Sequence, residues 1–101
     1  MTLRHVVLFG FGKAQSPAAV AEVIRRFAEL KELVPGVDEF EWGENSSSEG
    51  LDRGHSHAFL LTFADAQARD AYLVHPDHSA FGTWVQQFVT SVTVLDYLVK
   101  S

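Results

Sequence analysis

The stretch SPAAVAEVIRRFAELKELVPG, from Ser16 to Gly36, sets the order of the elements around it. Ser16 is a favourable N-cap, and Pro17 supplies the backbone angle that the first helical position requires. Apolar residues then recur at steps of three and four, as on the buried face of a helix; they are Val20, Val23, Ile24, Phe27, Leu30 and Val34. Because Pro35 and Gly36 stop this pattern, we predict a helix over residues 17–34 with one apolar face.

The segments on either side of this helix have the composition of β-strands. The expected strands are 2–11, 37–43, 56–63 and 91–99, which are rich in β-branched and aromatic residues. In the second of them, strict alternation places Phe40 and Trp42 on one side of the sheet and Val37 on the other. The intervening residues 44–54 are polar and contain several serines and glycines, so we expect a loop there.

Two shorter helices are expected between the third and fourth strands, over residues 66–74 and 77–88. Asp65 is placed to cap the first of them. They are separated at His75 and Pro76, because the residue before a proline disfavours the helical region. The order βαββαβ predicts an α+β fold, a ferredoxin-like sandwich in which helices cover one face of a four-stranded antiparallel sheet.

Length and composition limit the class of protein. A chain of 101 residues corresponds to a single domain over residues 1–101. The absence of cysteine excludes disulfides, thiolate nucleophiles and Cys-ligated metals. A net charge of −5 with scattered basic residues argues against a nucleic-acid partner. No apolar stretch approaches the ~20 residues of a membrane span, and no signal-peptide pattern is complete. We therefore expect a cytoplasmic protein with no membrane partner.

Three of the expected strands, 2–11, 56–63 and 91–99, carry apolar residues on both faces. A sheet with one wet face should instead alternate between apolar and polar residues. The helices can cover only one face, and an uncovered apolar sheet face exceeds the few hundred Å² that monomers usually expose. We therefore predict a homodimer in which two copies pack through this open sheet face.

Histidines begin two of the apolar rows that face the predicted core. His5 precedes Val7 and Phe9 on the first strand, and His57 precedes Phe59 on the third. Each ring could be a buried neutral imidazole that is satisfied by a carbonyl or hydroxyl group. Two such rings on adjacent strands favour the alternative, in which they line a pocket.

Tyr72 and His78 lie on either side of the expected helix break. In the first turn of the second short helix, burial and the helix dipole both disfavour imidazolium. We therefore predict that His78 is neutral at pH 7, that its pKa lies below the ordinary value, and that a carbonyl or hydroxyl group holds its other nitrogen. A neutral imidazole can accept a proton, and the Tyr72 hydroxyl can donate a hydrogen bond to a developing oxyanion. The alternative is that Tyr72 is only a core-edge ring and His78 a surface residue.

These residues predict a pocket between the sheet and the helices that suits a small oxygenated organic molecule. Its expected lining is His5, Val7, Phe9, Phe27, Phe59, Tyr72, His78 and Trp84. We predict no metal site, because His55 and His57 have no nearby carboxylate ligand. The Gly10-Phe11-Gly12 segment lacks the third glycine of a dinucleotide fingerprint.

Several segments together resemble the stress-responsive A/B barrel (Dabb) family over essentially the whole chain. They are Arg4-His5-Val6-Val7-Leu8-Phe9, Gly43-Glu44-Asn45, His57, Thr62-Phe63 and Tyr72-Leu73-Val74-His75-Pro76-Asp77-His78. The family is a dimeric α+β barrel, and it includes polyketide cyclases of the olivetolic acid cyclase type, which perform an intramolecular aldol condensation without a cofactor. The resemblance implies that His78 is the general base, that Tyr72 donates a hydrogen bond to the thioester oxygen, and that His5 and His57 line the same cavity.

The resemblance implies a cofactor-independent lyase or cyclase that acts on a poly-keto or similarly acidic small substrate. The main alternative is a non-catalytic, stress-responsive homodimer that at most binds a small ligand. A monooxygenase of the same barrel superfamily is a third possibility. By the same resemblance, olivetolic acid cyclase has a different aromatic residue at the position of Phe27 and an aromatic residue at the position of Val89, so the identity of the substrate stays open.

Overall fold

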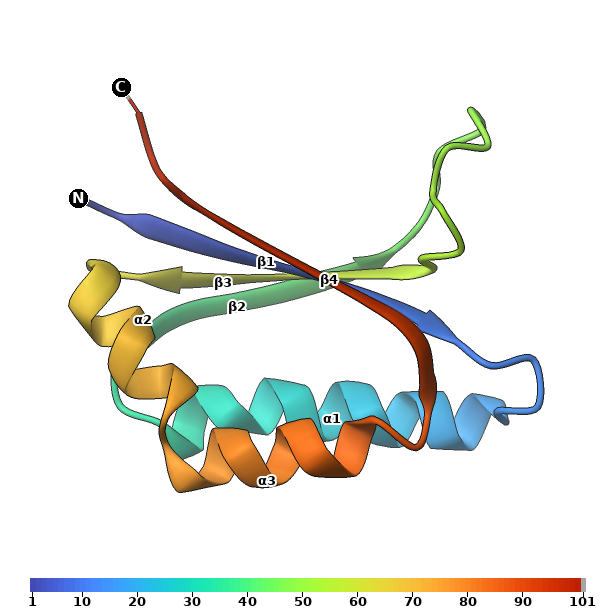
Figure 1. Ribbon diagram of the computed structural model, residues 1–101, viewed down its shortest axis with the longest axis horizontal. Helices are drawn as coiled ribbons and strands as arrows, with labels where there is room; N and C mark the ends of the chain where they lie inside the picture. The colour runs from blue at the N-terminus through green and yellow to red at the C-terminus, as the bar shows by residue number, and fades with distance from the viewer. Residues whose placement is uncertain (101) are drawn as a thin grey trace.

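The computed structural model describes residues 1–100. The elements follow the order β1 (Leu3–Phe11), α1 (Pro17–Leu33), β2 (Val37–Glu44), β3 (His57–Phe63), α2 (Ala66–Leu73), α3 (Pro76–Val85) and β4 (Val89–Leu98). The strands form one antiparallel sheet in the order β2-β3-β1-β4. The helices all lie on the same side of this sheet (Figure 1). The predicted ferredoxin-like α+β fold is therefore confirmed.

Helix α1 begins and ends close to the predicted residues. The Ser16 hydroxyl accepts a hydrogen bond from the Ala19 amide at 3.1 Å, and Pro17 occupies the first turn. The helix buries one face on the sheet; the buried residues are Val23, Phe27 and Leu30. It ends at Leu33, and Val34 is the C-cap rather than the last helical residue. Val34 nevertheless remains in the core, as its place in the apolar stripe predicts.

The helix break at His75 and Pro76 is present, and both short helices are capped by side chains. Asp65 accepts from the Ala68 amide at 2.9 Å, and His75 Nδ1 accepts from the Asp77 amide at 3.1 Å. Helix α3 ends at Val85 rather than near residue 88, and β4 begins at Val89 rather than residue 91. A turn at residues 86–88 connects them because the chain must leave the helix layer before it can pair with β1.

The prediction for the faces of β2 is wrong at its first residue. The pairing register with β3 shifts between Val37 and Glu39, so Val37 lies opposite Phe63 and Phe40 lies opposite Leu61. A bulge of this kind adds one residue to a strand and reverses the alternation beyond it. Val37 and Phe40 therefore both face the core, although strict alternation placed them on opposite sides.

One face of the sheet is covered and the other is not. The core lies between the sheet and the helices; it contains Leu3, Val7, Phe9, Val23, Phe27, Leu30, Val34, Val37, Phe59, Leu61, Phe63, Tyr72, Phe81 and Val85. On the opposite face, Val6, Leu8 and Leu60 are only half-buried, and Leu95 is 64% exposed. Within residues 1–100, no helix has the length and hydropathy needed to cross a membrane.

Candidate functional site

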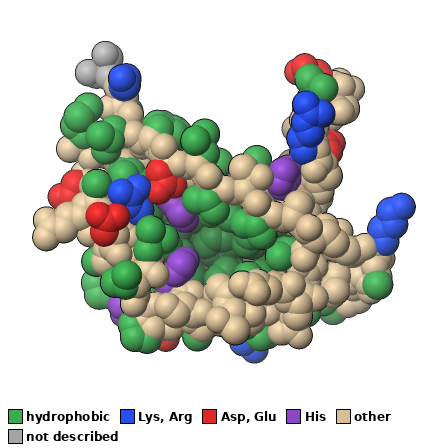
Figure 2. All heavy atoms as spheres, viewed as in Figure 1, with side chains coloured by type: hydrophobic (Ala, Val, Ile, Leu, Met, Phe, Trp, Pro, Cys, Tyr) green, Lys and Arg blue, Asp and Glu red, His purple; other side chains and the backbone are tan. Residues whose placement is uncertain are grey.

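A cavity of about 330 Å³ opens between the helices and the β1/β4 side of the sheet. Its lining is His5, Val7, Phe9, Phe27, Tyr72, Leu73, His78, Phe81, Gly82, Val85, Gln86, Val92 and Val94. Figure 2 shows a hollow between the two layers, lined by hydrophobic side chains and flanked by histidines. β4 is an edge strand that pairs with β1, with Val94 opposite Val7 and Val92 opposite Phe9. Val92 and Val94 consequently point toward the helices and yet stay exposed.

Tyr72 and His78 meet at one end of this cavity, on either side of the α2/α3 break. Their ring centroids are 4.5 Å apart. The Tyr72 ring is fully buried, and its hydroxyl has no hydrogen-bond partner among the described residues. Burial raises the pKa of Tyr72, so the phenol stays protonated near neutral pH. A buried, unpartnered hydroxyl is a costly group, and a ligand oxygen in the cavity would satisfy it.

His78 occupies the first turn of α3, as predicted. Its Nδ1 atom lies 3.1 Å from the Leu73 carbonyl oxygen, which can only accept, so Nδ1 carries the hydrogen. The lone pair of the neutral ring is then on Nε2. Burial lowers the pKa of His78, and the nearby His5 acts in the same direction, against the opposing hydrogen bond to Leu73. Both the direction of the pKa shift and the carbonyl partner agree with the prediction from sequence.

His5 is held by a carboxylate that was not predicted from the sequence. The Asp96 Oδ1 atom on β4 lies 2.6 Å from His5 Nδ1 on β1, and the two residues are directly opposite each other in the strand pairing. The other oxygen, Oδ2, lies 2.7 Å from Arg69 Nη1 on α2. Asp96 is the only charged residue among the strand residues of β4, and a lone carboxylate in an apolar strand is the signal that could have identified it.

The imidazole and phenol rings of the cavity therefore lie next to one another. His5 packs against Tyr72 with ring centroids 5.9 Å apart, and Tyr72 packs against His78. Apolar side chains make up most of the remaining wall. Such an arrangement can bind a small molecule by its apolar part and present one hydroxyl donor and imidazole acceptors to its oxygenated part.

Three residues that we expected at this cavity lie elsewhere. His57 faces the helix side at the far end of β3, where its ring stacks on Trp42 and its Nδ1 atom is 2.8 Å from Ser56 Oγ. Phe59 is fully buried beneath the cavity wall, with its ring 4.6 Å from that of Phe27. The strand register places Phe59 too deep, and His57 too far along β3, to reach the cavity.

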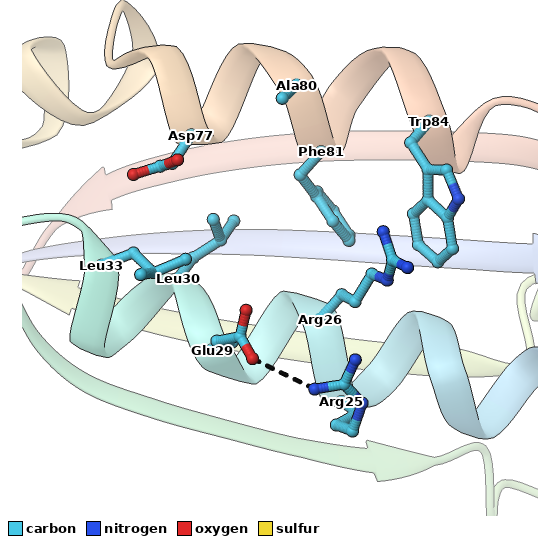
Figure 3. A pocket seen from close by; sticks show the side chains of 9 residues that line it. All are labelled: Arg25, Arg26, Glu29, Leu30, Leu33, Asp77, Ala80, Phe81 and Trp84. Atoms are coloured by element: carbon cyan, nitrogen blue, oxygen red, sulfur yellow. Dashed lines mark hydrogen bonds and ion pairs between the residues drawn. The ribbon is translucent and has the colours of Figure 1, made fainter.

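Trp84, the third of these residues, lies on the other side of α3. It lines a separate groove between α1 and α3, shown in Figure 3. The Arg26 guanidinium lies over its ring at 4.3 Å, a cation–π contact. One helical turn before it, Phe81 faces both the groove and the cavity. Trp84 thus belongs to the outer helix surface, because the turn of α3 directs it toward α1.

The two remaining histidines lie outside this cavity. His75 caps α3, and His55 lies in the loop before β3, where its Nδ1 atom is 2.8 Å from the Asp52 carbonyl oxygen. Within residues 1–100, no three His, Asp or Glu side chains are grouped as ligands for a metal ion.

Comparison with known proteins identifies the family. The model of the Stress Responsive A/B Barrel Domain matches residues 3–99. The chain belongs to the Dabb family. This Dabb chain is 35% identical over 95 residues to the stress-response A/B barrel domain-containing protein HS1 of Arabidopsis thaliana, covering 94% of this chain and 87% of HS1. It is 23% identical over 97 residues to olivetolic acid cyclase of Cannabis sativa, covering 96% of each chain.

Solved structures share the Dabb fold of this chain. The crystal structure of At3g17210 from Arabidopsis thaliana is similar with a TM-score of 0.94 and 34% identity, covering 98% of this chain and 96% of that one. A Jannaschia protein described as dimeric and ferredoxin-like has a TM-score of 0.83 and 28% identity, covering 98% of this chain and 100% of that one.

Proposed function

We propose that this chain is a cofactor-independent lyase or cyclase that removes a proton from an acidic carbon of a small poly-keto substrate. The observation that carries the proposal is the pairing of a buried, unpartnered Tyr72 hydroxyl with His78, whose free lone pair is on Nε2. The family likeness to olivetolic acid cyclase supports the same chemistry.

The proposed reaction begins when His78 Nε2 takes a proton from a carbon between two carbonyl groups. The electron pair of the broken C–H bond forms an enolate, and Tyr72 donates a hydrogen bond to its oxygen. The enolate carbon then attacks another carbonyl carbon of the same molecule and forms a C–C bond. The resulting alkoxide takes back the proton from His78, so the base is regenerated and no electrons leave the system.

We also propose that the working unit is a homodimer that forms through the uncovered sheet face. Dimeric relatives of the same fold support it. The exposed apolar side chains of β4 on this face, above all Leu95, support it further, because water-exposed apolar surface favours association.

The catalytic assignment is tested with a linear poly-β-ketone thioester, whose cyclised product is measured by mass spectrometry. We expect His78→Ala to lower turnover about 10²-fold to 10⁴-fold, the usual contribution of a general base. His55→Ala is the matched control, since it removes an imidazole that lies outside the cavity. Equal turnover of the wild type and His78→Ala would refute the role of His78. Binding of the thioester without any conversion would instead favour the non-catalytic, ligand-binding dimer.

A further inference from the structure

Arg69 lies outside the cavity lining, one helical turn before Tyr72 on α2. Its guanidinium contacts two carboxylates: Nε is 2.7 Å from Asp70 Oδ1, and Nη1 is 2.7 Å from Asp96 Oδ2. Only 21% of the Arg69 side chain is exposed. The contact with Asp96 joins α2 to the edge strand β4 at the residue that pairs with His5, which lines the cavity.

The two oxygens of Asp96 have different partners. Oδ2 accepts from Arg69, and Oδ1 is 2.6 Å from His5 Nδ1. An ionised carboxylate can only accept, so His5 Nδ1 carries a hydrogen that it donates to Oδ1. The result is a continuous chain, Arg69 to Asp96 to His5, that runs from the α2 surface into the cavity.

Charged groups lie along this chain and beside it. Arg69 is permanently cationic and balances the charge of Asp96, whose side chain is only 20% exposed. Asp70 is 67% exposed, so water screens its charge. The other rings against His5 are those of Tyr72 and Phe63, which carry no charge near pH 7. His78 lies near His5 in the same cavity, so a positive charge on one imidazole opposes a positive charge on the other.

We propose that Arg69 is a positioning residue, which holds Asp96 so that His5 stays neutral with its hydrogen on Nδ1 and its lone pair on Nε2. The inference rests on the proposed function of the cavity and extends it. His5 and His78 then present two imidazole acceptors beside the single hydroxyl donor of Tyr72. The one donor matches a carbonyl oxygen of the substrate, and the two acceptors match groups with acidic hydrogens on either side of that carbonyl.

The charge and tautomer of His5 are measured directly by ¹⁵N NMR of the imidazole rings at pH 7. The wild type is expected to show neutral His5 with Nδ1 protonated. In Arg69→Gln, the Asp96 charge is balanced by His5 alone, so the His5 signals should move to those of imidazolium. Arg69→Lys keeps the charge and should restore most of the wild-type signal. Arg25→Gln is the matched control, because Arg25 also contacts two carboxylates but lies on exposed α1.

The spectrum of the wild type is a test by itself, because imidazolium at His5 would overturn the proposal. The proposal therefore stays testable even if Arg69→Gln does not fold. Unchanged His5 signals in a folded Arg69→Gln protein would overturn it equally. Turnover of the poly-β-ketone thioester by Arg69→Gln should fall about 10-fold, as for the loss of one hydrogen bond to a reacting group. The NMR result does not depend on turnover, so failure of the proposed reaction and failure of this inference are distinguished.

Discussion

At the scale of single residues, His78 should impose a pH dependence with a defined sign. Its pKa is lower in the folded protein than in the unfolded chain, mainly because the ring is partly buried. The unfolded state therefore binds a proton first as the pH falls. The stabilising contribution is fully present above pH ~6.5 and is lost as the pH falls through the folded value.

We expect turnover to fall with the same protonation, because only neutral His78 can act as a base. Ring NMR titration of the free protein and the pH profile of kcat/KM should report one and the same inflection below pH ~6.5. His55→Ala should leave that inflection unchanged. An NMR titration in which His78 becomes protonated above pH 7 would contradict the assignment and favour a general-acid role.

Tyr72→Phe should separate stability from function at a single atom. The variant removes a buried hydroxyl that has no partner within residues 1–100, so the free energy of unfolding should not fall and should rise by up to about 1–3 kcal/mol. Turnover of the poly-β-ketone thioester should fall about 10²-fold to 10³-fold, as on removal of an oxyanion donor. Urea unfolding and product formation measure the two effects. A large loss of stability together with full turnover would show that the hydroxyl is structural.

At the scale of elements, the end of β1 meets the loop that precedes β3 at Gly10. A Cβ atom at this position would collide with the Gly54 carbonyl oxygen and with Ser91 Oγ. We therefore expect Gly10→Ala to lower the free energy of unfolding by about 1–3 kcal/mol, the usual cost of overpacking. Gly12→Ala is the control on the same segment, because its Cβ would meet only ordinary contacts at 3.5 Å or more. Equal urea midpoints for the two variants would contradict this close approach.

At the scale of the whole molecule, the uncovered sheet face should control association. Light scattering is expected to give twice the chain mass of 11.2 kDa for the wild type. Leu95→Asp should convert the protein to the single-chain mass, because it places a charge in an apolar interface. Val74→Asp is the control, as Val74 is also a well-exposed apolar residue but lies at the end of α2. A wild-type mass near 11.2 kDa would refute the dimer.

The sequence alone was sufficient for features that depend on neighbouring residues. The Ser16 cap, the apolar stripe of α1 and the break at Pro76 follow from backbone preferences and helical period, and all three are present. The place of His78 in the first turn of α3 follows from the same local signals, whereas the sequence left open whether a carbonyl or a hydroxyl group would hold its ring. A bulge inside β2 was not predictable, because it changes the faces of the strand without a distinct sequence signal.

Only the tertiary structure decided which distant residues share the cavity. His5 and Asp96 are 91 residues apart and meet because β1 and β4 pair in one particular register. The register also places His57 opposite Phe9, away from Tyr72 and His78. Periodicity assigns a residue to one face of its own helix or strand. The residues that it contacts on other elements depend on how those elements pack together, which is decided by the whole core.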